Sequence, residues 1–342
     1  MKLEQQHSEK PILVLGATGA MATYLVPELL SMGYTIKAVS LDHVISKNPR
    51  LTSIQGNTKD KAFMQSLLSE KYSAIVDFMI YGTAEEFQKV YASLLQSTDH
   101  YIFFSSYRIY AGNYPITETS PRLLEASDNK EYLAREDEYS LYKAREEDIL
   151  QKSSYSNWTI VRPSITFSKR RFQLVTLEAP DFIERAKAGQ PVFIPEAART
   201  VQGTMTWAGD TAKMLAGLLF NPLAYRECFT LGTAEHHTWG EIAGYYQELI
   251  GLKPVFISTE DYLKILGSDK RTRYQLDYDR LFNRIIDNSK ILRVTGLKQE
   301  NFISLRDGLQ KELSALPNEK IWQDSQRSRN MDQYLKDHPQ IH

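Results

Sequence analysis

A short apolar run followed by a glycine-rich turn stands near the start of this 342-residue chain. Residues 12–15 read ILVL, residues 16–22 read GATGAMA, and apolar side chains then recur at helical spacing. This order predicts a strand, a tight turn and a helix. Such a turn requires small residues where a pyrophosphate approaches the backbone: Gly16 for the turn, Gly19 for the approach and Ala22 for close packing of helix on strand. The segment therefore predicts a dinucleotide-binding site.

Strand-like and helix-like segments alternate after this turn. Further strands are expected at residues 35–39, 51–54, 74–79, 101–105 and 158–162. Helices are expected at residues 59–70, 85–96, 209–220, 239–249 and 304–313, and around Tyr139. This alternation predicts a parallel sheet with helices on both faces. Segment 111–135, which is polar and contains prolines, is expected to be a loop across the top of the sheet.

The fold class predicted from this pattern is α/β. We expect a Rossmann-type doubly wound parallel sheet with a smaller mixed C-terminal substrate-binding region. The expected boundaries are a nucleotide-binding domain over 1–165 with its core from about residue 11, an α/β substrate-binding region over 166–315 interleaved with that core, and a polar tail over 316–342.

The composition excludes several classes of partner. Forty-one lysines and arginines stand against 42 acidic residues, so no overall field favours nucleic acid or an anionic membrane. The chain lacks the apolar run of about 18 residues that a bilayer span needs. Its polar start and single cysteine, Cys228, predict a cytoplasmic protein. Seven histidines and one cysteine show no metal-ligand spacing, so no metal is expected.

Two later segments carry hydroxyl and amine groups suited to hydride chemistry. Residues 103–112 read FFSSYRIYAG at the end of an expected strand, and residues 136–148 read EDEYSLYKAREED. Tyr139 and Lys143 stand four residues apart, so on a helix they share a face, where the ammonium favours ionisation of the phenol. Carbonyl reduction needs a proton donor and a second hydrogen bond, which a tyrosine and a serine supply. The other charged residues of 136–148 are expected to form a solvated or dimer-facing surface.

The end of the second expected strand bears on the choice of cofactor. An acidic residue is usual there for the ribose hydroxyls, but counting from the glycine loop reaches Ser40, with Asp42 two residues further on. Ser40 could contact a 2′-phosphate, with His43, Lys47 or Arg50 nearby for charge. NADP is therefore as credible as NAD.

In their order and spacing, these segments resemble the extended short-chain dehydrogenase/reductase family, in its nucleotide-sugar epimerase/dehydratase branch. The resemblance runs from about residue 11 to residue 315. The matching segments are the cofactor loop GATGAMA, the adenine-side QGNTKD (55–60) with Asn57 in place of an aspartate, FFSSYRIYAG with the catalytic serine at Ser106, YSLYK (139–143), VRPSITFS (161–168), MTWAGDTAKML (205–215) and NRIIDNSKILRVTGL (283–297).

The resemblance implies a role for each matching residue. Tyr139 would be the general acid/base, Lys143 would bind the ribose, and Ser106 would hold the substrate oxygen. Cofactor contacts are implied for Gly16, Thr18, Gly19, Ala20, Met21, Ala22, Ser40, Asn57, Thr58, Met79, Ile80, Tyr139, Lys143, Pro163 and Ile165. Substrate contacts are implied for Ser106, Tyr107, Arg108 and Arg199, with Arg199 against a diphosphate.

The resemblance thus implies an NAD(P)-dependent epimerase or keto-reductase that acts on a nucleotide-activated sugar, as a homodimer. Family dehydratases carry an Asp–Glu pair after the serine or threonine; here Tyr107 and Arg108 stand there, so dehydration is not expected. The alternative is an atypical, non-catalytic member that acts as an RNA-binding or regulatory NAD(P)-binding protein. The basic cluster SKRR (168–171) is either a substrate-phosphate contact or a solvated loop.

Overall fold

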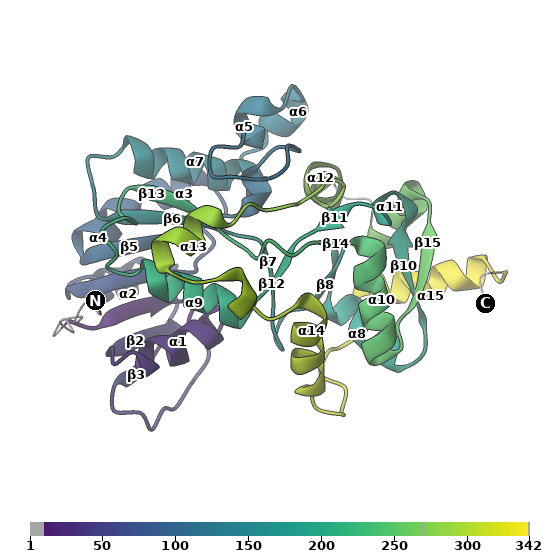
Figure 1. The fold of residues 1–342 in the computed structure, drawn as a ribbon, viewed down its shortest axis with the longest axis horizontal. Helices are drawn as coiled ribbons and strands as arrows, with labels where there is room; N and C mark the ends of the chain where they lie inside the picture. Colours follow the sequence, from purple (N-terminus) through teal and green to yellow (C-terminus); the bar gives the residue numbers. More distant parts are fainter. Residues whose placement is uncertain (1–9, 268–269, 341–342) are drawn as a thin grey trace.

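A seven-stranded sheet forms the larger part of the structure, a computed structural model that describes residues 10–267 and 270–340 (Figure 1). The strand order is β13-β6-β5-β4-β1-β2-β3, and every neighbouring pair is parallel. The strands are β1 (Ile12–Leu15), β2 (Ile36–Ser40), β3 (Leu51–Gln55), β4 (Tyr72–Asp77), β5 (Thr98–Phe104), β6 (Trp158–Pro163) and β13 (Glu227–Leu231). The order reverses direction between β1 and β4, which is the switch point of a doubly wound fold. The predicted fold class is confirmed.

Helices cover both faces of this sheet. Alternate residues of β1 enter different cores: Ile12 and Val14 enter one, Leu13 and Leu15 the other. The first core packs against α1 (Ala22–Ser31), α9 (Ala208–Leu218) and α13 (Ser289–Thr295). The second packs against α2 (Lys61–Leu67), α3 (Ala84–Gln88), α4 (Tyr91–Gln96) and α7 (Tyr139–Lys152).

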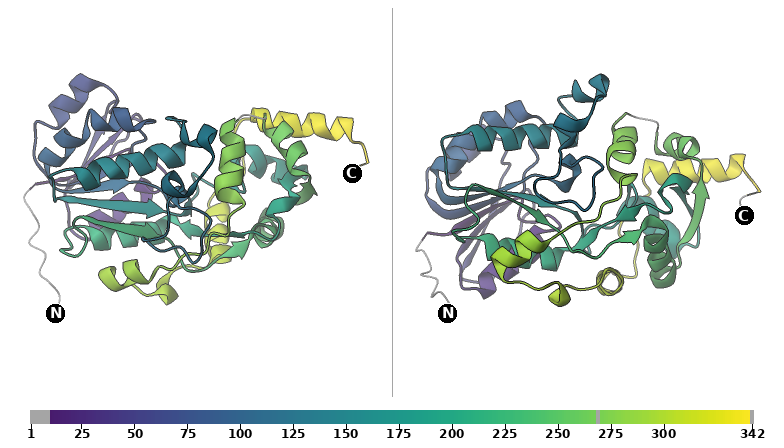
Figure 2. Two further views of the ribbon diagram at one scale, coloured as in Figure 1. Left: turned by 90° about the horizontal axis from the view of Figure 1, so that it is seen from above. Right: turned by 45° about the horizontal axis from the view of Figure 1, so that its top comes forward.

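The C-terminal region forms a separate lobe beside the carboxyl ends of the strands, and Figure 2 shows it from two further sides. Its own large apolar core lies among α8 (Ala179–Lys187), α10 (Trp239–Ile250), α11 (Thr259–Leu266), α14 (Leu305–Ser314) and α15 (Gln326–Asp337). Short strand pairs complete it: β10 (Pro191–Pro195) with β15 (Lys253–Ile257), β7 (Ile165–Phe167) with β12 (Met205–Trp207), β8 (Gln173–Leu174) with β9 (Leu177–Glu178), and β11 (Gln202–Gly203) with β14 (His237–Thr238). Helix α12 (Lys270–Gln275) continues into a π-helical turn, Leu276–Arg280.

Two expected elements differ from the structure. The helix expected at 85–96 is broken into α3 and α4, because Val90 leaves helical backbone angles with φ −120°. The expected loop 111–135 contains α5 (Leu123–Ala126) and α6 (Lys130–Leu133). The side chain of Asn129 caps α6, and the buried ring of Tyr132 stacks on Tyr278. Helices this short show no periodicity in the sequence. In the described parts of the chain, none of the helices has the length and apolar character of a membrane span.

Candidate functional site

A cleft of about 450 Å³ opens at the carboxyl ends of the central strands, between the sheet and the C-terminal lobe. Several elements that are distant in sequence contribute to it. Its lining consists of Met21, Phe78, Met79, Ile80, Phe104, Ser105, Ser106, Tyr107, Arg108, Tyr139, Lys143, Pro163, Ser164, Ile165, Arg171, Gln173, Glu178, Gln275 and Arg280. Ligands of open α/β sheets bind at this edge.

The glycine loop has the shape that a pyrophosphate requires. The backbone N–H of Gly16 donates to the carbonyl of Val39 at 3.0 Å, and that of Gly19 donates to the carbonyl of Gly16 at 3.0 Å. Gly16 has φ +79°, and a Cβ atom there would lie 3.3 Å from Cβ of Phe78. No side chain caps the start of α1 at Met21; the backbone N–H groups of Thr23 and Tyr24 donate to the carbonyls of Gly19 and Met21, at 3.1 and 3.0 Å. These residues fit a dinucleotide.

The predicted ribose and adenine residues lie at the ends of β2 and β3, beside this loop. Ser40 donates its hydroxyl to the carbonyl of Asp42 at 3.0 Å. Asn57 accepts a hydrogen bond from the backbone N–H of Lys59 at 3.0 Å, and the hydroxyl of Thr58 lies 3.3 Å from Sδ of Met79. The structure therefore places these residues at the same sheet edge as the glycine loop but outside the cleft lining.

Ser106, Tyr139 and Lys143 meet at the cleft. Ser106 follows β5 and accepts a hydrogen bond from the backbone N–H of Arg108 at 3.2 Å. Tyr139 is the first residue of α7 and is half-buried. The guanidinium of Arg108 lies 5.0 Å from the centroid of its ring. Lys143 lies one turn further along α7, and its ammonium lies 4.8 Å from the ring centroid of Phe103. The helical spacing predicted from the sequence thus brings the phenol and the amine to one side of α7.

The predicted phosphate contact at Arg199 lies elsewhere. Its guanidinium donates to Glu196 at 2.8 and 2.7 Å and lies 3.7 Å from the ring centroid of Phe256, and its side chain is 48% exposed. It is not among the residues that line the cleft. Three other arginines do line it: Arg108, Arg171 from the basic cluster noted in the sequence, and Arg280.

Arg280 reaches the cleft from a part of the chain that gave no sequence signal. It closes the π-helical turn after α12, forms an ion pair with Asp279, and donates to the carbonyl of Val175 at 2.7 Å. Arg108 lies 3.4 Å from Asp279 and 3.6 Å from Glu138. Asp279 thus anchors two guanidinium groups of the cleft. Arg108, Arg171 and Arg280 thus bring three guanidinium groups to the cleft, and the carboxylates of Asp279 and Glu138 lie beside two of them.

The expectation that the charged residues of 136–148 form a solvated surface is wrong for Glu138, Glu146 and Glu147, which are buried. Glu147 accepts two hydrogen bonds from Arg162 of β6, at 2.8 and 2.6 Å. Glu146 lies 3.0 Å from the ammonium of Lys143. Burial raises the pKa of Glu146 to about 7, against the attraction of Lys143. Periodicity cannot identify buried glutamates whose partners lie elsewhere in the fold or on the same helix face.

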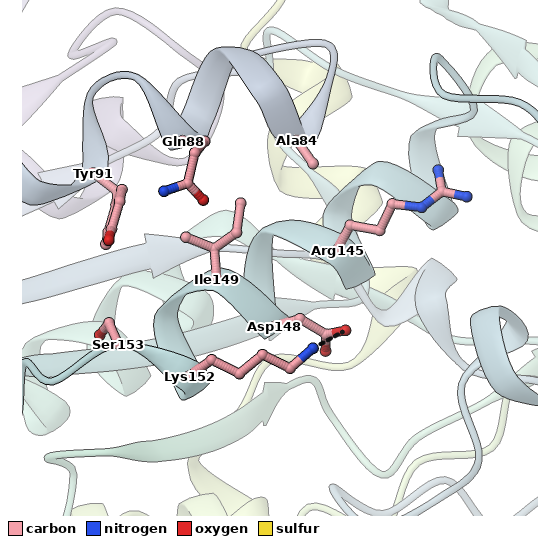
Figure 3. A pocket seen from close by; sticks show the side chains of 8 residues that line it. All are labelled: Ala84, Gln88, Tyr91, Arg145, Asp148, Ile149, Lys152 and Ser153. Atoms are coloured by element: carbon pink, nitrogen blue, oxygen red, sulfur yellow. Dashed lines mark ion pairs between the residues drawn. The ribbon is translucent and has the colours of Figure 1, made fainter.

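A second pocket, of about 430 Å³, lies on a different face of α7 (Figure 3). Its lining residues include Gln88 from α3, Tyr91 from α4, and Arg145 and Lys152 from α7. It contains none of the residues predicted for catalysis. Within residues 10–267 and 270–340, no group of three or more histidine, cysteine or acidic side chains could hold a metal ion.

Comparison with known proteins agrees with this geometry. A family model described as NAD(P)H-binding matches residues 16–187, and no curated protein matches the sequence. An epimerase from Methanothermobacter thermautotrophicus is similar over 89% of this chain and 90% of its own, with 16% identity and a TM-score of 0.69. The UDP-glucose 4-epimerase of Thermotoga maritima is similar over 89% and 97%, with 16% identity and a TM-score of 0.64. The UDP-glucuronic acid 4-epimerase of Bacillus cereus, in complex with UDP-glucuronic acid and NAD, is similar over 89% and 98%, also with 16% identity and a TM-score of 0.64.

These structural likenesses show the fold, and the family model spans just over half of the chain. The glycine loop that begins the matched segment is also the part of the structure shaped for a pyrophosphate. The chain therefore belongs to the NAD(P)H-binding family, with NAD or NADP as its cofactor.

Proposed function

We propose that the protein is an NAD(P)-dependent epimerase or keto-reductase that acts on a nucleotide-activated sugar, with Tyr139 as its acid/base. The observation that carries this proposal is the meeting of Ser106, Tyr139 and Lys143 in one cleft beside a dinucleotide-shaped loop. Similar solved structures include epimerases of UDP-glucose and of UDP-glucuronic acid, which supports a nucleotide sugar as the substrate class.

The chemistry follows from the groups present. A bound nicotinamide would supply the hydride acceptor for a sugar carbon that carries a hydroxyl group. Tyr139 takes the proton of that hydroxyl as the carbonyl forms, and returns it when the carbonyl is reduced again. Ser106 donates a hydrogen bond to the same oxygen. Lys143, on the next turn of α7, lines the same cleft and would bind the cofactor ribose. An epimerase receives the hydride back on the opposite face of the sugar; a reductase catalyses only the reducing half.

The arginines of the cleft supply charge for the nucleotide. A guanidinium binds phosphate oxygens in bidentate fashion. Arg171 lines the cleft and forms no ion pair within the described parts of the chain, so it has donors to offer; Arg280 lies nearby but already binds Asp279. We assign the diphosphate contact to Arg171 in place of Arg199. The remaining expectations, a cytoplasmic homodimer without nucleic-acid partners, form part of the same proposal.

Replacing Tyr139 by phenylalanine tests the proposal directly. We expect turnover of a nucleotide-sugar substrate, found by screening, to fall by about 10²–10⁴-fold because the proton donor is lost. The affinity for NADH should change little, since the ring and the glycine loop remain. Tyr142→Phe is the matched control: Tyr142 lies on the same helix, its ring contacts that of Tyr139, and its hydroxyl has no assigned role.

The outcomes separate the alternatives. An active Tyr139→Phe variant would show that another group supplies the proton. NADH binding without turnover of any nucleotide sugar would favour the regulatory, non-catalytic alternative. The cofactor that co-purifies, identified by mass spectrometry, distinguishes the two activities: retained NAD indicates an epimerase, whereas an empty site that reloads with NADPH indicates a reductase.

A further inference from the structure

The ammonium of Lys143 forms an ion pair with a carboxylate of its own helix. Nζ of Lys143 lies 3.0 Å from Oε2 of Glu146, and the two side chains are 1% and 0% exposed. Neither group has a hydrogen-bond partner beyond this ion pair in the described parts of the chain. Two aromatic rings flank the ammonium, with centroids 4.8 Å away at Phe103 and 5.9 Å away at Tyr142. A buried positive charge is costly unless a counter-charge lies beside it, and Glu146 supplies that counter-charge.

Other charged groups near Glu146 are already occupied. Asp77, at the end of β4, accepts hydrogen bonds from the hydroxyls of Tyr81 and Tyr101, both at 2.6 Å. Glu147 is bound by Arg162. Within residues 10–267 and 270–340, Glu146 is the carboxylate that lies at ion-pair distance from Lys143. In the described parts of the chain, no other donor binds the oxygens of Glu146.

We propose that Glu146 is a positioning residue for the cofactor site: its ionised carboxylate fixes the ammonium of Lys143 where the cofactor ribose needs it. The inference rests on the proposed role of Lys143 at the ribose. Burial raises the pKa of Glu146 to about 7, so the counter-charge is present above neutrality and is lost below it. Asp77, Tyr81, Tyr101 and Glu147 face the same site, and the Asp77 and Glu147 charges oppose ionisation of Glu146.

This arrangement predicts opposite effects of Glu146→Gln on stability and on cofactor affinity, which a purely structural ion pair would not produce. The folded protein holds the Glu146 proton more tightly than the unfolded chain, so stability from this group is present below pH 4.5 and is lost as pH rises to about 7. Because glutamine does not ionise, the Glu146→Gln variant does not lose this stability as the pH rises. Between pH 5 and pH 8, the unfolding midpoint of the variant should therefore rise relative to that of wild type, while its affinity for the cofactor falls.

The experiment measures NADH affinity by fluorescence titration and urea midpoints at several pH values between 5 and 9, without any sugar. We expect wild type to bind NADH more tightly as pH rises through about 7, and Glu146→Gln to lack this step and bind about tenfold more weakly at pH 8. Glu147→Gln, equally buried on the same helix, is the matched control; it should keep the step but move it to lower pH, because the Glu147 charge raises the pKa of Glu146.

Several results would overturn the inference. The Glu146→Gln variant could keep the wild-type step in NADH affinity. Alternatively, its unfolding midpoint relative to that of wild type could fall or stay constant as the pH rises. If the step in NADH affinity also disappears in Glu147→Gln, then its loss in Glu146→Gln is due to general damage of α7. Because no sugar is present, a failure to find a nucleotide-sugar substrate would count against the proposed function and not against the role of Glu146.

Discussion

Replacing Glu147 by glutamine tests how the helix that carries Tyr139 is fixed to the sheet. Glu147 and Arg162 are both buried and share two hydrogen bonds, at 2.8 and 2.6 Å. Arg162 also donates to the hydroxyl of Tyr110 at 2.9 Å and to the carbonyl of Glu118 at 3.0 Å. The variant keeps the volume and one acceptor but leaves the guanidinium without a counter-charge. Breaking one partner of a buried pair costs about 3–5 kcal/mol, and the retained acceptor favours a value of about 3 kcal/mol.

Urea unfolding followed by tryptophan fluorescence measures this effect, and Trp158 at the start of β6 lies on the affected strand. With a slope of about 3 kcal/mol per molar urea, the unfolding midpoint should fall by about 1 M. The double variant Glu147→Met, Arg162→Leu should recover most of the loss, because an apolar pair of similar volume carries no desolvation penalty. A single variant within about 0.3 M of wild type, or a double variant no better than the single, would refute the reasoning.

Two further predictions concern the cofactor loop and the response to acid. Gly16→Ala should cost about 1–2 kcal/mol, because Gly16 has φ +79° and the new methyl group would lie 3.3 Å from Phe78, and calorimetry should show weaker NADH binding. Gly244→Ala, inside α10 and with nothing within 4 Å of the added methyl, should leave NADH binding unchanged and raise stability by about 0.5–1 kcal/mol. Burial lowers the pKa of His100 to about 3, and its Nδ1 accepts from the backbone N–H of Phe220 at 3.1 Å. Stability from His100 is therefore present above pH 6.5 and is lost toward pH 3 at about 1.4 kcal/mol per pH unit, so His100→Gln should flatten the acid-unfolding curve.

The parts of the fold that the sequence predicted are those that depend on neighbours along the chain. The turn at Gly16 and the pairing of Tyr139 with Lys143 follow from spacings of a few residues, and the structure places both beside the cleft. Arg199 illustrates the limit of prediction from local sequence motifs. Its position in a motif suggested a phosphate contact, but Glu196 stands three residues before it and binds its guanidinium. Arg280 enters the cleft through the packing of the C-terminal lobe, which no local pattern encodes.

The adjacent glutamates of α7 show why a charged run need not be a solvated surface. Successive residues of a helix point about 100° apart. Glu147 accordingly faces Arg162 on β6, while Glu146 faces the same side as Lys143. Arg162 donates two hydrogen bonds to Glu147, whereas Glu146 has a single contact, and burial raises the pKa of Glu146 to about 7. Glu147 therefore holds α7 on the sheet through Arg162, whereas Glu146 can respond to pH next to Lys143. Loss of the first should be seen in unfolding, and loss of the second in cofactor binding.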